Sequence, residues 1–386
     1  MKNMDILTVS YAYIKKGYLD TFNHYPEKDR ISFLLPKIWK AKGGKLKFYP
    51  PKERNILRTN FFFHHSHYPL IGGLLKGWAP LFPLFLLKRK YQLVYSCSEP
   101  SLLSTLYQGL WAKLFGLKHI IFTWENIPYE NKFKGVNLLL KKIIIKLNLL
   151  LSDGVVCGNQ KAKVIFSKIT SKPIAVIPLS GVDTDFFRRE DGFKEIENYN
   201  LTGKIVFNFS GAIGYRKGLQ VILRAFKKVL AEIPNAHLVI MGSGEYEDKV
   251  RELVRELGLN ENLTLTSWQD REGLKRGLNA SDVFLYPSLS YGGWEEQFGY
   301  SMAEASLMEL PVISTRSGSI GEVVLDGETG LLVEPDDIDG LKEAMVRLGK
   351  DSELRKKMGQ AGRKYIIENY SYQIIANKFY IFFKSL

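Results

Sequence analysis

The second half of this chain is built around Ser288-Leu289-Ser290-Tyr291-Gly292-Gly293-Trp294-Glu295-Glu296-Gln297-Phe298-Gly299-Tyr300-Ser301-Met302-Ala303-Glu304-Ala305. A strand-like apolar run stops at Pro287, and a helix-like run starts near Phe298 or Gly299. A strand, a glycine loop and a helix N-terminus can hold a phosphate, because backbone N–H groups and the helix dipole point at it. Glu296 and Glu304, with seven residues between them, can accept hydrogen bonds from sugar or ribose hydroxyls. We therefore expect this stretch to bind a nucleotide-sugar.

Length and composition predict a globular protein of two domains. The chain has 386 residues, of which 45% are hydrophobic and 24% charged. Its two cysteines, Cys97 and Cys157, lie in strand-like runs, which argues against a disulfide framework and suits a reducing compartment. Residues 1–10 contain no long apolar segment, and no apolar run reaches the roughly 18 residues that span a bilayer. We expect a cytoplasmic protein.

The net charge of +14 is unevenly distributed. Residues 1–180 contain 28 Lys and Arg against 9 Asp and Glu, a net charge of +19. Residues 181–386 contain 26 against 31, a net charge of −5. The basic half predicts an anionic partner, which would be a membrane surface or nucleic acid. A basic surface that serves only solubility is the simpler alternative.

The order of strand-like and helix-like runs predicts parallel sheets covered by helices. In the first half, a helix is expected over 102–115, and the expected strands are 5–10, 31–35, 45–49, 92–96, 119–123, 154–157 and 174–178. In the second half, helices are expected over 219–232 and 247–257, and the expected strands are 204–209, 237–241, 263–266, 282–286, 311–314 and 330–333. The fold class is α/β, with one domain over 1–182, a second over 183–369, and a helix over 370–386 that packs back on the first.

Three segments of the first half depart from this alternation. Residues 70–90 and 132–151 combine apolar bulk with lysines, which is typical of helices that lie in a membrane interface. An ordinary helix that covers the sheet is the alternative, and for 132–151 the two readings are about equal. For 70–90 the membrane is favoured, because prolines at 69, 80 and 83 make a long packed helix unfavourable. Residues 60–67 contain three histidines without an evident partner ligand, so we favour a loop facing an acceptor over a metal site.

Two further loops of the second half are candidate phosphate sites. Residues 211–218 carry three glycines after a strand, with Gly214 among them, and end with the cations Arg216 and Lys217 at a helix start. Gly242 opens a second glycine turn at a strand end, and Trp268 follows the next strand, where it could stack on a base or belong to the core. Ligands of parallel sheets bind at the carboxyl ends of strands, so these loops and the Glu296–Glu304 stretch predict one site.

Taken together, the second half resembles the retaining nucleotide-sugar glycosyltransferases of family 4, the group 1 transferases. The resemblance rests on the paired glutamates 296 and 304 with Phe-Gly between, on Arg216-Lys217-Gly218 before a helix, on 178–183, and on Gly318 to Glu322 and Asp326 to Gly330. It covers about residues 175–370. It implies the GT-B architecture, in which two Rossmann-like domains face each other across a cleft.

The resemblance also implies a role for each matching residue. Lys217, with Arg216, would neutralise the diphosphate leaving group, and Glu296 would contact the donor sugar. Glu304 would bind the ribose hydroxyls, and the N–H groups of Phe298 and Gly299 would hold phosphate. The remaining donor-site candidates, which would surround the nucleotide, are Gly214, Gly242 and Trp268.

Some residues depart from the family pattern. The usual arginine five positions before the lysine is Ala212 here, and Arg216 would replace its charge. In the first domain, Trp124, Glu125 and Asn126 stand where the family often has a histidine, and a double-glycine loop is reduced to Gly17. With Glu99, these residues are the candidates for facing the acceptor or the sugar.

The expected reaction is transfer of a sugar, with retention, from a UDP- or GDP-sugar to a lipid-linked or otherwise membrane-held acceptor. No acidic metal-binding pair stands out, so cations and helix N–H groups would stabilise the leaving group without metal or cofactor. Front-face attack and double displacement at Glu296 both remain open. The alternatives are a nucleotide-sugar epimerase, a non-catalytic protein of this architecture and, more remotely, a nucleic-acid binder. The place expected for the transferase is the inner face of a membrane.

Overall fold

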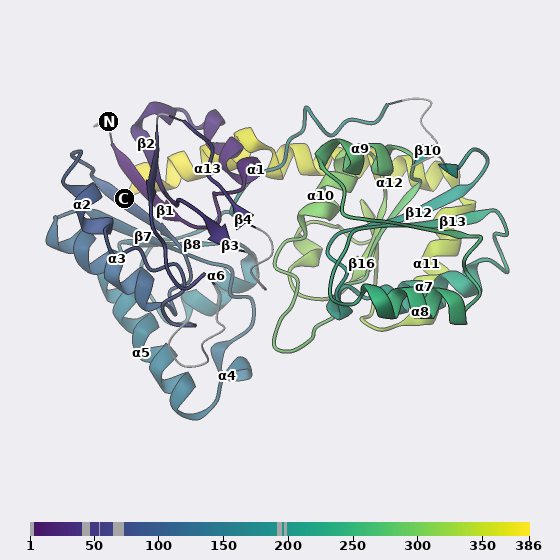
Figure 1. Ribbon diagram of the computed structural model, residues 1–386, viewed down its shortest axis with the longest axis horizontal. Coiled ribbons are helices and arrows are strands. Elements are labelled where there is room, and N and C mark those ends of the chain that lie inside the picture. The colour runs from purple at the N-terminus through teal and green to yellow at the C-terminus, as the bar shows by residue number, and fades with distance from the viewer. Residues whose placement is uncertain (1–3, 41–46, 54, 65–72, 191–194, 197–198) are drawn as a thin grey trace. The chain divides into compact units, whose positions relative to one another are not determined.

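The computed structural model describes residues 4–40, 47–53, 55–64, 73–190, 195–196 and 199–386. The chain forms two compact units (Figure 1), of which the first comprises Met1–Gly181 and Tyr372–Leu386, and the second comprises Val182–Ser371. Each unit contains a parallel sheet with helices packed on it, as the alternation of apolar runs predicts.

The sheet of the first unit has seven parallel strands in the order β5-β2-β1-β6-β7-β8-β9. The strands are β1 (Ile6–Ser10), β2 (Ile31–Pro36), β5 (Ile56–Thr59), β6 (Leu93–Cys97), β7 (Lys118–Thr123), β8 (Gly154–Cys157) and β9 (Ile174–Val176). β1, β2, β6 and β8 are buried along their whole length, which explains why they appear in the sequence as short continuous apolar runs.

One predicted strand of this sheet is wrong. Residues 45–49 were expected to join the parallel sheet, but β4 (Lys47–Phe48) pairs antiparallel with β3 (Trp39–Lys40) in a sheet of their own. The edge of the main sheet is instead β5, which pairs with β2. The side chain of Lys47 is exposed and Pro50 follows closely, so this run offers neither the burial nor the length of a sheet strand.

Helices connect the strands of the first unit. They are α1 (Lys16–Leu19), α2 (Phe82–Leu86), α3 (Leu103–Leu114), α4 (Tyr129–Lys132), α5 (Gly135–Leu151) and α6 (Gln160–Ser167), with the 3-10 helices η1 (Asp20–His24) and η2 (Lys28–Arg30). The helix predicted over 102–115 is confirmed as α3. Asn159 begins α6 as its cap, because its side chain accepts a hydrogen bond from the backbone N–H of Ala162 at 2.8 Å.

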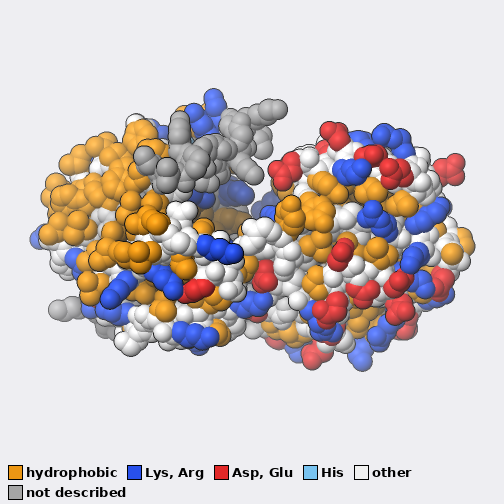
Figure 2. Space-filling model, turned by 90° about the horizontal axis from the view of Figure 1, so that it is seen from below, with side chains coloured by type: hydrophobic (Ala, Val, Ile, Leu, Met, Phe, Trp, Pro, Cys, Tyr) orange, Lys and Arg blue, Asp and Glu red, His pale blue; other side chains and the backbone are white. Residues whose placement is uncertain are grey.

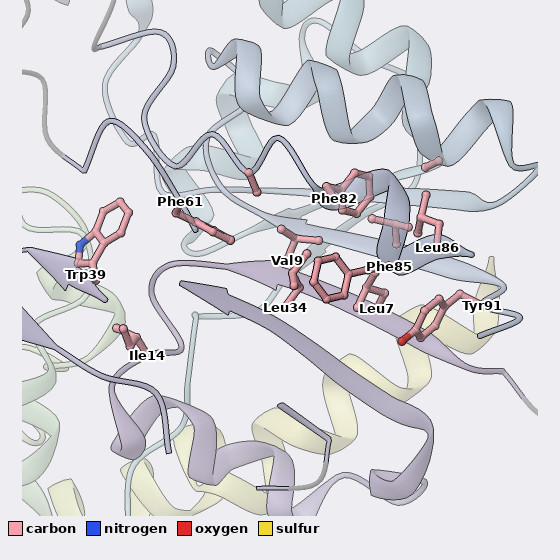
Figure 3. Packing of buried hydrophobic residues seen from close by; sticks show 13 residues of the cluster. Leu7, Val9, Ile14, Leu34, Trp39, Phe61, Phe82, Phe85, Leu86 and Tyr91 are labelled. Atoms are coloured by element: carbon pink, nitrogen blue, oxygen red, sulfur yellow. The ribbon is translucent and has the colours of Figure 1, made fainter. Parts of the chain in front are cut away.

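The segment 70–90 contributes to the core of the first unit. Residues 70–72 lie outside the described residues, and α2 occupies only Phe82–Leu86. Phe82, Phe85 and Leu86 are buried in one cluster with Leu7 and Val9 of β1 and Leu34 of β2 (Figure 3). On this side, α2 therefore packs on the sheet as an ordinary covering helix does, which was the alternative to a membrane helix.

The C-terminal helix α13 (Tyr372–Ser385) belongs to the first unit. The ring of Phe379 packs against those of Phe22 and Tyr95, at 5.3 and 5.7 Å between ring centroids. Near its end, Lys384 pairs with Glu27 at 2.9 Å. The helix thus supplies part of the apolar cover of the sheet, which accounts for its six buried side chains: Tyr372, Ile375, Ala376, Phe379, Phe382 and Phe383.

The second unit contains a six-stranded parallel sheet in the order β14-β13-β12-β15-β16-β17. Its strands are β12 (Ile205–Ser210), β13 (Ala236–Met241), β14 (Leu263–Thr266), β15 (Val283–Tyr286), β16 (Val312–Thr315) and β17 (Gly330–Val333), and β10 (Glu195–Ile196) pairs with β11 (Tyr199–Asn200) outside it. The sheet strands match the predicted ones closely. The chain runs outward from β12 in one direction and then returns to place β15 on the other side of β12.

Helices cover both faces of this sheet (Figure 1). α7 (Leu219–Val229), α8 (Glu247–Glu256) and α11 (Ile338–Lys350) lie on one face, and α9 (Arg271–Asn279), α10 (Tyr300–Leu307) and α12 (Ser352–Tyr370) on the other. Aspartates cap three of them, because Asp270, Asp337 and Asp351 each accept a hydrogen bond from a backbone N–H of the first turn. None of the helices in the described ranges is both long and apolar enough to cross a membrane.

Candidate active site

The candidate site lies at the carboxyl edge of the second sheet. β12 and β15 are neighbours there although they are far apart in sequence, so the strand order reverses between them. Open α/β sheets bind ligands at such a point, outside the carboxyl ends of the strands. The loop 211–218 follows β12 and the loop 287–299 follows β15, so the fold brings both predicted motifs to this edge.

The two glycine turns after β12 and β13 pack against each other. The backbone N–H of Ile213 donates to the Ser243 carbonyl at 3.0 Å. A Cβ added at Gly242 would lie 1.9 Å from the Gly211 carbonyl oxygen, and one added at Gly244 would lie 2.2 Å from that of Ile213. Close packing of two loops therefore accounts for Gly242, and its contact with a nucleotide stays a prediction. Gly214 differs, because a Cβ there would meet open space.

Lys217 lies at the centre of the candidate site. It ends the 3-10 helix η3 (Tyr215–Lys217), and its buried ammonium donates to the Glu296 carboxylate, with Nζ and Oε2 2.5 Å apart. Its second acceptor is the hydroxyl of Tyr286, at the end of β15. Burial lowers the pKa of Lys217, while the charge of Glu296 opposes this shift. The ion pair with Glu296 therefore favours the charged form of this buried ammonium.

Gly218, which follows Lys217, is required by the backbone at this point. Its φ of +72° is left-handed, and a Cβ would lie 2.1 Å from the Pro287 carbonyl oxygen. The loops after β12 and β15 are thus in direct backbone contact, and the N–H of Leu289 donates to the Arg216 carbonyl at 2.7 Å. This contact fixes the distance between Lys217 and the loop that carries Glu296.

Arg216 presents a buried donor beside Lys217. Its guanidinium lies over the ring of Trp294, 3.4 Å from the ring centroid. Its Nη1 atom is buried and has no hydrogen-bond acceptor in the described part of the chain, and Glu296 Oε2 is 4.0 Å away. A buried guanidinium nitrogen without an acceptor is costly, and a phosphate oxygen is a ligand that would satisfy it. Ala212, where the family usually has its arginine, is exposed.

Glu296 and Glu304 occupy different surroundings. The backbone carbonyl of Glu296 accepts a hydrogen bond from the N–H of Ser319 at 2.8 Å, so the turn at Gly318 holds this residue in place. Glu304 lies in α10 and is half-buried, and burial raises the pKa of its carboxyl to about 7 against a weaker opposing effect of Arg271. Within the described residues, no side chain donates a hydrogen bond to this carboxyl, so it offers acceptors for hydroxyls.

The residues predicted to open the helix are placed as follows. α10 begins at Tyr300, and Gly299, with a left-handed φ of +83°, precedes it as the cap. The Phe298 ring is buried against those of Tyr300 and Tyr370. Contact of the two N–H groups with phosphate stays a prediction. Trp268 follows β14 with 63% of its surface exposed, which excludes the core position that was its alternative.

The first-unit candidates gather at the carboxyl ends of β6 and β7, except for Gly17. The Glu99 carboxylate accepts hydrogen bonds from Thr123 Oγ1 at 2.7 Å and from the N–H of Trp124 at 2.8 Å. Burial and the charge of Glu125 raise the pKa of Glu99 to about 7. Glu125 is buried and paired with Lys132 at 2.8 Å, and Asn126 is buried next to it. Gly17 lies apart in α1, where its carbonyl accepts from the Tyr372 hydroxyl at 2.9 Å.

The structure also shows site residues that sequence reasoning missed. Trp294 and Tyr286 contact the two cations, and only the position of Trp294 two residues before Glu296 could have suggested its role. Of the predicted histidine loop 60–67, His64 packs on Trp39 at 4.6 Å between centroids, and His65 and His67 lie outside the described residues. No three His, Cys, Asp and Glu side chains that the structure describes are arranged as a metal site requires.

The sequence of this chain is similar to those of known proteins. Residues 192–365 match the sequence model of the family described as glycosyl transferases group 1. The chain is 31% identical over 197 residues to the GDP-mannose-dependent alpha-(1-6)-phosphatidylinositol monomannoside mannosyltransferase of Mycolicibacterium smegmatis, which is 50% of this chain and 52% of that relative. It is 27% identical over 263 residues, 66% of this chain and 67% of the relative, to the capsular polysaccharide biosynthesis glycosyltransferase CapM of Staphylococcus aureus.

Solved structures match the whole length of the chain. The Anabaena protein HepE in complex with UDP and glucose superposes with a TM-score of 0.75 at 16% identity, covering 100% of both chains. This likeness concerns the fold, which is therefore the GT-B fold of two Rossmann-like domains. In sequence, by contrast, the chain spans about half the length of the mannosyltransferases it matches.

Proposed function

We propose that this chain, whose residues 192–365 match the model of the glycosyl transferases group 1 family, moves a sugar from a nucleoside-diphosphate sugar to a membrane-held acceptor. The observation that carries the proposal is the cationic pair at the carboxyl edge of the second sheet. Lys217 is buried on Glu296, and Arg216 offers a buried nitrogen without an acceptor. The relatives named above are transferases, which favours transfer over epimerisation.

The two cations would act on the leaving group. When the bond between the sugar and the diphosphate breaks, negative charge grows on the phosphate oxygens. Arg216 and Lys217 are held in place before the reaction, by the Trp294 ring and by Glu296 with Tyr286, so little reorganisation is needed. In our proposal the departing phosphate takes the acceptor's proton on the same face, which gives retention, and no metal takes part.

Glu296 and Glu304 would recognise the two ends of the donor. Glu304, half-buried and without a donor of its own, would accept hydrogen bonds from the ribose hydroxyls. Glu296 is already engaged by Lys217, so its remaining acceptor capacity would meet the sugar. A thermal-shift panel of UDP-, GDP- and ADP-sugars tests this donor site, because a ligand that binds only the folded protein raises its stability. No shift with any of them would contradict the proposal.

The acceptor is proposed to be membrane-held because of the charge distribution. Residues 1–180 carry a net charge of +19, and the mycobacterial relative is named for a phosphatidylinositol-based acceptor. Anionic lipids of the cytoplasmic leaflet attract basic surfaces. We therefore place the enzyme at the cytoplasmic face of a membrane as a peripheral protein.

Replacing Trp294 by alanine is expected to weaken binding of the nucleoside diphosphate by about tenfold, because Arg216 loses the ring that orients its guanidinium. Trp294→Phe keeps a ring under the guanidinium and should retain most of the affinity. Isothermal titration calorimetry with UDP and GDP measures both variants. Equal affinities for the alanine variant and the wild type would refute this role of Trp294.

Donor affinity is expected to rise with pH up to about 7, where the pKa of Glu304 lies. Ribose hydroxyls favour the ionised carboxylate, so below that pKa the affinity should fall by up to about tenfold per pH unit. Calorimetry between about pH 5.5 and 8.5 measures this slope. Glu304→Gln should bind the donor more weakly, and its affinity should vary with pH only as far as the phosphate of the donor itself titrates. An affinity that depends on pH as strongly as in the wild type would refute the assignment of Glu304 to the ribose hydroxyls.

The same raised pKa has a consequence for stability. The folded protein holds a proton on Glu304 that the unfolded chain has released above its ordinary pKa of 4.5. The contribution of this group to the free energy of unfolding therefore falls as pH rises from 4.5 to about 7 and is constant above that. At about pH 8 we expect Glu304→Gln to melt at a higher temperature than the wild type.

A further inference from the structure

The outer face of α5 exposes an unbroken row of aliphatic side chains. Its members recur at intervals of three and four residues, which places them on one side of the helix. They are exposed to between 41% and 72%, and we call them the α5 stripe: Val136, Leu139, Leu140, Ile143, Leu147 and Leu150. Single exposed aliphatic residues are ordinary, but six on one helix face mark an interaction site.

The α5 stripe lies on the side of the helix opposite to the one that packs on the first unit. The opposite side of α5 already packs on the first unit through Ile144, Ile145 and Leu149. Asn148, on that same side, is fully buried, and its Nδ2 donates to the Pro100 carbonyl at 2.8 Å. The helix is therefore fixed through its inner face, and the stripe remains exposed.

An apolar groove adjoins the stripe. A cavity of about 700 Å³ opens between α5 and α6, and Leu147 and Leu150 of the stripe line it together with Ile165 and Ile169. The groove also contains lysines, Lys142, Lys146 and Lys172. Aliphatic surface with lysines at its border continues from the stripe into the groove.

The charges around this surface fit an anionic lipid. Lys142 pairs with Glu130 at 2.7 Å, whereas Lys146 has no acidic partner in the part of the chain that the structure describes. The stripe contains no aromatic, amide or hydroxyl group, although protein interfaces are rich in Tyr, Trp and hydrogen bonds. In Figure 2, orange and blue side chains dominate the visible surface of the first unit, whereas red ones gather on the second.

We propose that the α5 stripe docks this protein on an anionic phospholipid membrane. The aliphatic side chains enter the boundary between head groups and acyl chains, the α5–α6 groove extends the apolar contact, and Lys146 and Lys172 meet lipid phosphates. This inference rests on the proposed function in one respect: it names the surface that would bring the enzyme to its membrane-held acceptor.

Sedimentation of the full chain with vesicles tests the proposal, using phosphatidylcholine alone and phosphatidylcholine with phosphatidylglycerol. The wild type should bind the anionic vesicles at low salt. Leu139→Ser/Ile143→Ser/Leu150→Ser should bind at least about tenfold more weakly, because three exposed aliphatic groups no longer enter the interface. Lys146→Gln/Lys172→Gln should lose about fivefold per lysine on anionic vesicles only.

Ile381→Ser is the matched control, since Ile381 is an aliphatic residue of α13 that is 60% exposed. It should bind vesicles as the wild type does. Vesicle binding that survives in the triple stripe variant would overturn the proposal, because another surface would then hold the membrane. Self-association of the wild type that the stripe variant abolishes, without vesicle binding, would show that a second copy covers the stripe.

The vesicle assay contains no sugar donor, so its outcome is independent of whether the protein binds nucleotide-sugars. A wild type that shifts with nucleotide-sugars but ignores vesicles overturns this inference and the peripheral placement, and it leaves the proposed sugar transfer standing. A wild type that binds vesicles but no nucleotide overturns the proposed function alone.

Discussion

Lys217→Ala is expected to lower kcat for sugar transfer by at least about 100-fold, the loss typical of removing one pre-organised donor to a developing anion. The substitution removes the ammonium whose Nζ lies 2.5 Å from Glu296 Oε2, and with it the charge that would face the departing diphosphate. Affinity for the free nucleoside diphosphate should fall as well. Initial rates with radiolabelled donor at saturation, together with calorimetry, measure both effects.

The controls for this experiment separate charge from folding. Lys217→Ala leaves the Glu296 carboxylate buried without its cation, which costs stability as well as activity. Lys217→Ala/Glu296→Gln removes that unpaired charge, so it should recover melting temperature but not transfer. Lys228→Ala removes a lysine of the following helix, α7, whose partner Asp339 is exposed, and it should leave stability and transfer unchanged. Wild-type transfer by Lys217→Ala would refute the assigned role.

Gly218→Ala is expected to destabilise the second unit by about 3–5 kcal/mol and to abolish transfer. The added Cβ would lie 2.1 Å from the carbonyl oxygen of Pro287, which belongs to the backbone and cannot move aside as a flexible side chain could. The loops after β12 and β15 would separate, and Lys217 would leave Glu296. Thermal unfolding of the variant and its transfer rate report the two consequences.

Gly203→Ala is the matched control for the left-handed backbone. Gly203 has a φ of +74°, close to the +72° of Gly218, but a Cβ there would meet nothing within 4 Å. It should therefore cost only about 1–2 kcal/mol, the price of a left-handed alanine, and leave transfer unchanged. Equal losses in the two variants would show that strain of the backbone, and not the contact with Pro287, explains the effect.

The sequence predicted the parts of the fold that repeat a simple rule. Strands such as β12 and β13 are buried on both faces and therefore appear as short apolar runs between turns. β5 was missed because it is a short edge strand with an exposed Arg58, and its pattern resembles a loop. Residues 45–49 were wrongly included because their alternation of lysines with apolar residues suits a strand but does not reveal which partner the strand pairs with.

The site was predictable to the extent that its residues lie in recognisable loops. Lys217 and Glu296 follow neighbouring strands, so their approach follows from the order of the sheet once β12 and β15 are known to be adjacent. The stacking of Arg216 on Trp294 was not predictable, because it depends on how two loops fold back on each other. The pKa of Glu304 likewise follows from burial, which the sequence of α10 does not specify.

The path of the chain through the first unit has a consequence for how the protein is synthesised. The second unit is one continuous segment, Val182–Ser371, and can fold as soon as it leaves the ribosome. The first unit is interrupted by it and needs Tyr372–Leu386 to cover Phe22 and Tyr95. The unit whose synthesis begins first is therefore completed last, and until Tyr372–Leu386 is made, the apolar surface that this segment covers is exposed.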